Sequence, residues 1–196
     1  VDRGQNITIA DNDISDCSQG IYSRSTDDGD FTVTKNLRIA GNTFTNNGIV
    51  AQEGKHTVYT ESLGIVFEFN RFGPMRIGAT GNSIKDRSAG TVIRYNRIED
   101  GAHAVDLVEA EDFPVIAKAS PSYRNTYVYG NQISKPGDTG SMIHYGGDHA
   151  GSEANYRKGT LYFWNNTLYA ASGNSNAFFQ LSTTEEKAEV WNNIFG

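Results

Sequence analysis

Four titratable residues in this chain suit acid–base chemistry. Lys85 and Arg87 stand two residues apart, and Asp106 and His144 follow further along. Histidine exchanges protons near neutral pH, because its unperturbed pKa is about 6.5. A lysine among other cations has its pKa pushed down, which favours a basic role. We therefore predict catalytic roles for all four, with Lys85 or Arg87 as the base and His144 as an acid or alternative base.

Further polar and aromatic residues could hold a substrate near these groups. Arginine and glutamine donate hydrogen bonds, and a tyrosine ring stacks on a substrate or donates its proton. The predicted substrate-binding residues are Arg76, Gln180, Tyr145, Tyr156 and Arg157.

The acidic phrase "EAED" offers several carboxylates within one predicted loop. Calcium takes about six to eight oxygen ligands, and clustered carboxylates supply them. We predict a Ca²⁺ site at Glu109, Glu111 and Asp112, with an ordinary solvated acidic stretch as the alternative.

A sequence phrase that recurs along the whole chain must form the scaffold that positions these residues. An alternating run followed by Asn-x-Ile, Leu or Phe recurs from "ITIADNDIS" to "VWNNIFG". It carries Asn12, Asn42, Asn70, Asn96, Asn131, Asn166 and Asn193, with gaps of 30, 28, 26, 35, 35 and 27 residues. The runs are short, β-branched or aromatic, and bounded by Gly, Asn and Asp, as strands are. We predict an all-β, right-handed parallel β-helix of about six to seven coils, with residues 1–196 as one domain.

The recurring asparagines have a predicted structural role. Asparagine tolerates left-handed backbone angles, so each one is expected to form a corner of its coil. Neighbouring coils would lie about 4.8 Å apart. At that spacing the amides can bond to one another as a ladder.

A second strand is expected after each asparagine phrase. Its predicted inward residues are Ile21, Ile49, Met75, Val105, Ile143 and Phe179. The residues that follow them would point outward: Tyr22, Val50, Arg76, Asp106, His144 and Gln180. Arg76, Asp106 and His144 would then form a polar row on one face, close to the charged turn that carries Lys85 and Arg87.

Composition narrows the classes of partner. The net charge of −6 argues against a nucleic-acid surface. No apolar run approaches the length of a membrane span. The ends of the chain interrupt the repeat without a capping element, so we expect a segment of a longer polypeptide, with its oligomeric state open.

The asparagine coils, together with "KDRSAGTVIRYNRIEDG", resemble bacterial parallel β-helix proteins of the pectate-lyase-like superfamily. The phrase "RSAGTVIRYNRI" is most similar to the alginate lyase and chondroitinase B branch. In that branch a Lys-Ser phrase lies nine residues before a Tyr-Asn-x-Phe phrase, and the lysine is the catalytic base. Here Arg87 stands at that position and Lys85 lies two residues earlier, while "VDLVEAED" replaces the Leu-Arg-His-Gly phrase of the branch.

The resemblance implies β-elimination, or C5 epimerisation, in an acidic, uronate-containing polysaccharide by a secreted or periplasmic protein. Two alternatives stay open. Paired carboxylates, Asp106 with Glu109 or Asp112, would suit a glycoside hydrolase. A non-catalytic carbohydrate-binding or adhesive solenoid would instead use aromatic platforms at Tyr22, Tyr59, Tyr123 and Phe113.

Overall fold

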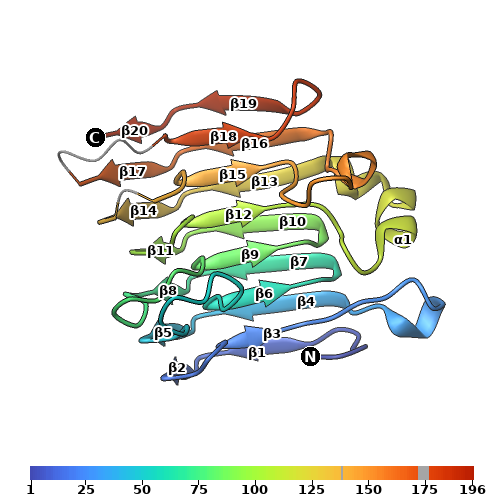
Figure 1. Cartoon of the computed structure of the whole chain (residues 1–196), viewed down its shortest axis with the longest axis horizontal. Helices are drawn as coiled ribbons and strands as arrows, with labels where there is room; N and C mark the ends of the chain where they lie inside the picture. Colours follow the sequence, from blue (N-terminus) through green and yellow to red (C-terminus); the bar gives the residue numbers. More distant parts are fainter. Residues whose placement is uncertain (138, 172–176) are drawn as a thin grey trace.

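The chain winds into a stack of coils whose strands form three parallel sheets (Figure 1). The computed structural model describes residues 1–137, 139–171 and 177–196. Among these residues, two sheets have seven strands and the third has six, which gives six three-stranded coils and a seventh coil with two strands. The two ends of the chain lie at opposite ends of the stack (Figure 1). The predicted parallel β-helix of six to seven coils is confirmed.

The first sheet contains the strands that precede the recurring asparagines. They are β1 Thr8–Ala10, β4 Lys35–Ala40, β7 Leu63–Glu68, β10 Ala89–Arg94, β13 Asn125–Tyr129, β16 Thr160–Trp164 and β19 Lys187–Trp191. The second sheet follows the asparagines. Its strands are β2 Asp13–Ser15, β5 Thr43–Thr45, β8 Arg71–Phe72, β11 Arg97–Ile98, β14 Gln132–Lys135, β17 Thr167–Ala170 and β20 Ile194–Phe195.

The third sheet carries the outward row that matters for function. Its strands are β3 Ile21–Tyr22, β6 Val58–Thr60, β9 Ile84–Asp86, β12 Val105–Leu107, β15 Ile143–Tyr145 and β18 Phe179–Leu181. The helical segments are all short: α1 Pro114–Ala119, η1 Asp30–Thr32, η2 Pro121–Arg124 and η3 Glu153–Asn155. In the described part of the chain, no helix has the length and apolar character needed to cross a membrane.

The core fills the inside of the coils with columns of apolar side chains. Ile39, Phe67 and Ile93 are fully buried and occupy the same register position in successive coils. Phe44 and Phe72 stack with their ring centroids 4.8 Å apart and their planes 3° from parallel. Because every coil repeats the same inward positions, burial fixes the register, and the residues between them must face outward.

The predicted asparagine ladder is confirmed. In each step from Asn12 to Asn193, the side-chain Nδ2 donates to Oδ1 of the next asparagine at 2.9 to 3.1 Å. The expected left-handed backbone at these asparagines is wrong, because the positive φ angle belongs to the preceding residue, such as Phe69 and Tyr95, both at 57°. The corner residue turns the chain, and the asparagine behind it satisfies the backbone groups that the turn leaves open.

The predicted register is wrong in two coils. The phrases at Ile49 and Met75 do not enter the third sheet, and Val50 instead pairs with Ala79 in an antiparallel bridge. The sheet strands of these coils come later, at Val58 and Ile84. The strands within "TVYT" and "SIKD" have only three residues each. Their alternating pattern is therefore weaker than that of the longer apolar phrases in the preceding turns.

Candidate functional site

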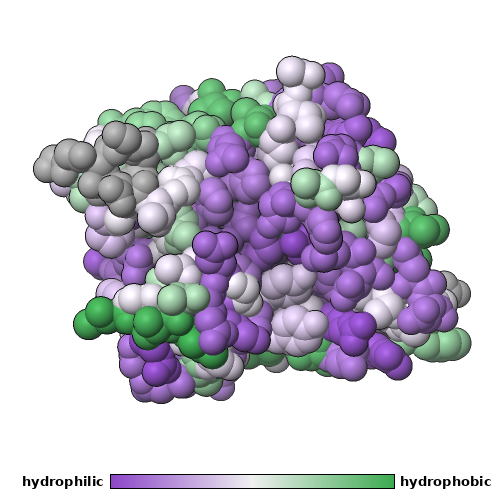
Figure 2. All heavy atoms as spheres, in the orientation of Figure 1, coloured by the Kyte–Doolittle hydropathy of each residue, from purple (hydrophilic) through white to green (hydrophobic). Residues whose placement is uncertain are grey.

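A cleft of about 910 Å³ lies on the outer face of the third sheet. Figure 2 shows this face, where hydrophilic residues gather in and around a central hollow. The cleft is walled by the turns that enter the sheet and by the loop after β15, including Gly147 and Asp148. A Cβ at Gly147 would come within 2.1 Å of the Tyr156 ring. Glycine at this position therefore lets the loop pack closely against its own Tyr156 ring.

One outward row of the sheet lines the floor. Parallel pairing brings six residues to the same register position: Tyr22, Tyr59, Lys85, Asp106, His144 and Gln180. Five of these, from Tyr59 to Gln180, line the cleft. The expectation that Asp106, His144 and Gln180 share a row is confirmed, and Lys85 belongs to that row as a strand residue rather than a turn residue.

Arg76 is not part of this row, so its predicted position beside Asp106 is wrong. It belongs to the turn between β8 and β9, where its guanidinium donates to the backbone oxygen of Asp16 at 3.0 Å. It lines a separate hollow with Val50. The misassigned strand register of the second and third coils is the cause.

Asp106 is the centre of the polar network. One oxygen, Oδ2, accepts hydrogen bonds from Lys85 Nζ at 2.7 Å and from Asn82 Nδ2 at 2.7 Å. The other, Oδ1, lies 2.8 Å from His144 Nδ1. Burial alone would raise the pKa of Asp106, but the hydrogen bond from His144 and the charge of Lys85 hold it well below its ordinary range. The group is therefore a carboxylate at neutral pH.

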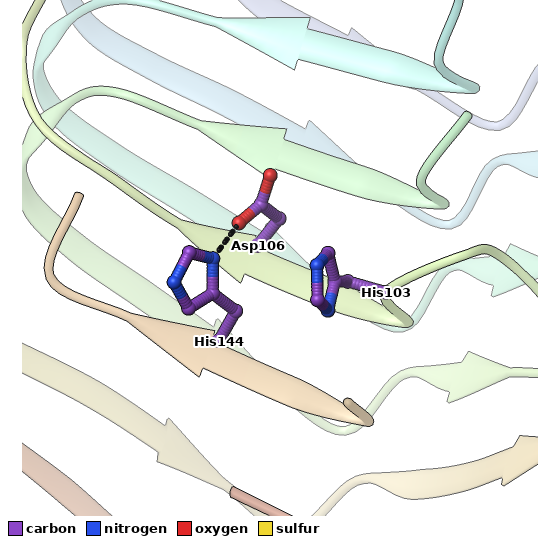
Figure 3. Close-up of side chains that lie close together, drawn as sticks. All are labelled: His103, Asp106 and His144. Carbon is purple, nitrogen blue, oxygen red and sulfur yellow. Dashed lines mark hydrogen bonds and ion pairs between the residues drawn. The ribbon is translucent and has the colours of Figure 1, made fainter. Parts of the chain in front are cut away.

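His144 is oriented by this carboxylate. Because a carboxylate only accepts, Nδ1 carries a proton and donates it to Asp106. Nε2 lies 3.0 Å from the hydroxyl oxygen of Ser182 at the edge of the cleft. The ring of His103 stacks on that of His144, with centroids 5.0 Å apart (Figure 3). His144 is thus held in one orientation, with Nε2 as the nitrogen that can gain or lose a proton.

Asp148 bridges the two cations of the cleft. One oxygen pairs with Lys85 Nζ, and the other accepts from Arg87 at 3.0 Å. Burial opposes its charge, but Lys85 and Arg87 outweigh burial and lower the pKa of Asp148. The Asp148 side chain is still 31% exposed, whereas that of Asp106 is 2% exposed. Asp148 is thus the accessible partner of both cations.

The predicted calcium residues have other partners. Glu109 is fully buried and accepts the backbone N–H groups of Asp148 and His149, both at 3.0 Å. Glu111 pairs with Arg87 at 3.1 Å. Asp112 lies 3.5 Å from Arg24. The structure therefore does not gather the three carboxylates, and calcium binding at Glu109, Glu111 and Asp112 stays a prediction.

Another group has its ligand atoms closer together. Within the described residues, His103, Asp106 and His144 each offer a ligand atom within 4.8 Å of the other two (Figure 3). Several of these ligand atoms already have hydrogen-bond partners. Asp106 accepts from His144, and His103 Nδ1 lies 3.0 Å from the backbone nitrogen of Ser141. These contacts describe a hydrogen-bonded network rather than an open set of metal ligands.

The remaining predicted substrate residues divide between core and cleft. Tyr145 is 1% exposed and belongs to the main core. Arg157 is also buried, and it donates to the backbone oxygens of Val108 and Asp86 at 2.9 and 2.8 Å and pairs with the Asp86 carboxylate. Both hold the coil together from inside. Tyr156 and Gln180 line the cleft, as do Lys85 and Arg87.

Sequence reasoning gave no role to several cleft residues. Beyond the predicted set, the cleft is lined by His56, Asn82, His103, Asp148 and Ser182, and by Tyr59, which was expected only as an aromatic platform of the adhesive alternative. His56, Asn82 and His103 stand two residues before the apolar residue that opens each strand: Val58, Ile84 and Val105. Correct register in the second and third coils would have revealed that spacing.

Comparisons of the chain with protein-family models, with curated proteins and with solved structures gave no match. The function must therefore be argued from the geometry of the cleft.

Proposed function

We propose that this β-helix cleaves an acidic, uronate-containing polysaccharide by β-elimination, with His144 as the base. The observation that carries the proposal is the pair formed by His144 and the buried Asp106 at 2.8 Å, on the floor of a cleft. A histidine whose Nδ1 donates to a carboxylate is held in one tautomer and leaves Nε2 to accept a proton, as a general base must. In the proposed step Nε2 takes the weakly acidic C5 proton, the C4–C5 double bond forms as the C4–O bond to the neighbouring sugar breaks, and the protonated Nε2 then gives its proton to the departing oxygen.

The geometry favours His144 over the other two base candidates. Arginine keeps its proton in proteins, and carboxylates surround the Arg87 guanidinium. The Lys85 ammonium donates to Asp106 and Asp148, so its protons stabilise those carboxylates. Lys85 and Arg87 instead supply positive charge beside the base.

The positive charge of Lys85 and Arg87 would stabilise the negative charge that develops during β-elimination. Loss of the C5 proton delocalises negative charge onto the adjacent uronate carboxylate, and nearby cations stabilise it. The bridge that Asp148 makes between Lys85 and Arg87 is the geometry a substrate carboxylate would adopt. Asp148 is the more exposed of the two carboxylates that pair with Lys85. We therefore infer that the uronate carboxylate displaces Asp148 from the two cations when the polymer binds.

Hydrolysis by paired carboxylates fits less well. A glycosidase needs one carboxyl group that stays protonated until it acts as the acid. The pKa values of Asp106 and Asp148 are both lowered, and Glu109 accepts two backbone N–H groups. C5 epimerisation starts from the same proton abstraction, so products distinguish it from elimination. A secreted or periplasmic location would give such an enzyme access to polymers outside the cell.

The test is incubation with alginate, pectate, chondroitin sulfate and dermatan sulfate, following the ultraviolet absorbance of the unsaturated uronate. We expect one of these polymers to be cleaved by the unaltered protein. His144→Gln should lower kcat/KM by about 10²- to 10⁴-fold, the usual contribution of a general base.

His149→Gln is the matched control, because His149 is exposed and contacts Glu111 rather than Asp106. It should leave the rate unchanged. Equal activity of the His144→Gln and unaltered proteins would contradict the assignment of the base. Binding without any turnover or epimerisation would instead favour the adhesive alternative, for which Tyr22 and Tyr59 lie on the same sheet with their ring centroids 5.5 Å apart.

A further inference from the structure

A second ladder runs along the wall of the cleft. The strand register pairs Val58, Ile84, Val105 and Ile143 across four coils. The residues two positions before them therefore occupy equivalent places: His56, Asn82, His103 and Ser141. Neither His56 nor His103 takes part in the proton transfer proposed for His144.

Each step of this row is a hydrogen bond from a backbone N–H to the side chain one coil earlier. Asn82 N donates to His56 Nδ1 at 3.0 Å, His103 N to Asn82 Oδ1 at 2.9 Å, and Ser141 N to His103 Nδ1 at 3.0 Å. Asn42 N donates to Asn70 Oδ1 at 3.0 Å in the asparagine ladder. The two histidines thus do through Nδ1 what an asparagine does through Oδ1.

This arrangement fixes the tautomer of the His56 ring and favours the same tautomer for His103. A backbone N–H always carries its hydrogen, so the Nδ1 that accepts it must be bare, and the ring proton lies on Nε2. His103 Nδ1 is also 3.0 Å from the Ser141 carbonyl oxygen and 3.1 Å from its hydroxyl. A proton on Nδ1 could be donated to that carbonyl oxygen, but it would point at the hydrogen of the Ser141 N–H. The uniform pattern of the row favours the acceptor role.

Both rings also favour the uncharged form. Burial, reinforced by the charge of Lys85, lowers the pKa of His56 to about 4, against opposing effects of Asp106 and Asp148. Burial likewise lowers the pKa of His103, reinforced by His144 and Lys85 and opposed by Asp106 and the Ser141 backbone. Near neutral pH each ring is then a neutral N–H donor.

The Nε2 atoms are open to the cleft. Both residues line it. Among the described residues, no hydrogen bond involves either Nε2, and neither atom is among the enclosed polar atoms without a partner. The two rings are two coil steps apart, which is about 10 Å along the stack.

We propose that His56 and His103 are substrate-binding residues whose Nε2–H groups donate hydrogen bonds to hydroxyl and carboxylate oxygens of successive units of a saccharide chain. This deepens the proposed function, and it rests on the cleft as the place where the saccharide binds, not on the cleavage step. A fixed neutral donor suits such a polymer because sugar oxygens accept hydrogen bonds whether or not they are charged.

The first test reads the tautomers by ¹⁵N NMR of the histidine side chains in the whole chain. We expect His56 and His103 to carry the proton on Nε2 and to titrate below the ordinary histidine pKa of about 6.5, with His56 titrating near pH 4. A protonated Nδ1, or titration near the ordinary value of about 6.5, would overturn the proposal.

The second test measures the affinity of alginate, pectate and chondroitin oligosaccharides for His56→Asn and His103→Asn by calorimetry, in the His144→Gln background. Asparagine keeps the ladder acceptor, as Asn82 does naturally, but removes the Nε2 donor. Each substitution should weaken binding about tenfold, the usual effect of one lost hydrogen bond to a polar ligand. His149→Asn is the matched control and should bind unchanged.

The outcomes separate the two proposals. Oligosaccharide that binds through His56 and His103 but is never cleaved or epimerised contradicts the proposed function and supports this inference. Cleavage with unchanged KM in both asparagine variants contradicts this inference and supports the function. If none of the oligosaccharides binds the cleft, both are contradicted.

Discussion

The four histidines of this chain differ in chemistry because their neighbours differ. His144 faces the carboxylate of Asp106, which places the proton on Nδ1 and leaves Nε2 as the acceptor. His56 and His103 accept backbone N–H groups, which favours neutral donors. His149 is exposed beside Glu111. Residue type alone therefore does not assign a role to a histidine here, since the partner of Nδ1 determines which nitrogen can act.

Glu61 gives a prediction at the same scale. It is fully buried, one carboxyl oxygen accepts the Ser25 N–H at 3.1 Å, and the other has no partner among the described residues. Burial raises the pKa of Glu61 from 4.5 to about 7. Between these values the folded state binds more protons than the unfolded state. The free energy of unfolding therefore falls as pH rises through this window, by roughly 3 kcal/mol.

Glu61→Gln should remove that dependence. The free energy of unfolding of the variant minus that of the unaltered protein should be larger at about pH 8 than at about pH 5. The reason is that the unaltered protein buries a charged carboxylate at about pH 8, whereas glutamine has no charge to bury. Urea unfolding at the two pH values measures the difference, with the exposed Glu189→Gln as a control. If the free energies of unfolding of the variant and the unaltered protein differ by the same amount at both pH values, Glu61 does not have a raised pKa in the folded state.

At the scale of elements, the asparagine ladder holds the coils in register. Asn96 is the clearest member, because its Oδ1 accepts both the backbone N–H and the Nδ2 of Asn70. Its own Nδ2 donates to Asn131 and to the backbone oxygens of Phe67 and Arg94. Removing this side chain leaves several buried polar groups unpaired.

Asn96→Ala should therefore lower the free energy of unfolding by about 2 to 4 kcal/mol. Asn12→Ala is the matched control at the edge of the ladder, where the side chain is exposed and the described residues make no hydrogen bond to its Oδ1. It should cost less than about 1 kcal/mol. Equal losses from the two substitutions, measured by urea unfolding, would argue against a ladder that stabilises through burial.

The same elements explain what could be predicted from sequence. The asparagine phrases are long and regular, so the coil number and the ladder were predictable. The shared row of Asp106, His144 and Gln180 followed from strong apolar partners at Val105, Ile143 and Phe179. The strands at Val58 and Ile84 have three residues each, too few to compete with longer apolar turns.

The predicted substrate role of Tyr145 disagrees with its own strand, because alternation with Ile143 inward and His144 outward turns Tyr145 into the core. The burial of Arg157 could not be predicted from sequence, since it depends on the loop between β15 and β16 bringing its guanidinium to the backbone oxygens of Val108 and Asp86. Glu109 holds that loop by accepting its N–H groups. These are contacts between segments far apart in sequence, and no local pattern encodes them.

At the scale of the whole molecule, stacking turns a short motif into an extended surface. Each coil adds one residue to the row on the third sheet, so groups from five coils line one cleft. A linear polymer suits such a surface, because successive units meet successive coils. In a chain of net charge −6, Lys85 and Arg87 are basic residues of this cleft to which an anionic polymer could bind in exchange for a carboxylate of the protein.

The most direct measurement is a crystal structure of His144→Gln with a bound uronate oligosaccharide that the unaltered protein cleaves. The account predicts that one uronate carboxylate lies between Lys85 and Arg87 in place of Asp148, with its C5–H directed at the side chain of residue 144. A saccharide bound with C5 turned away from that residue, or bound outside the cleft, would contradict it.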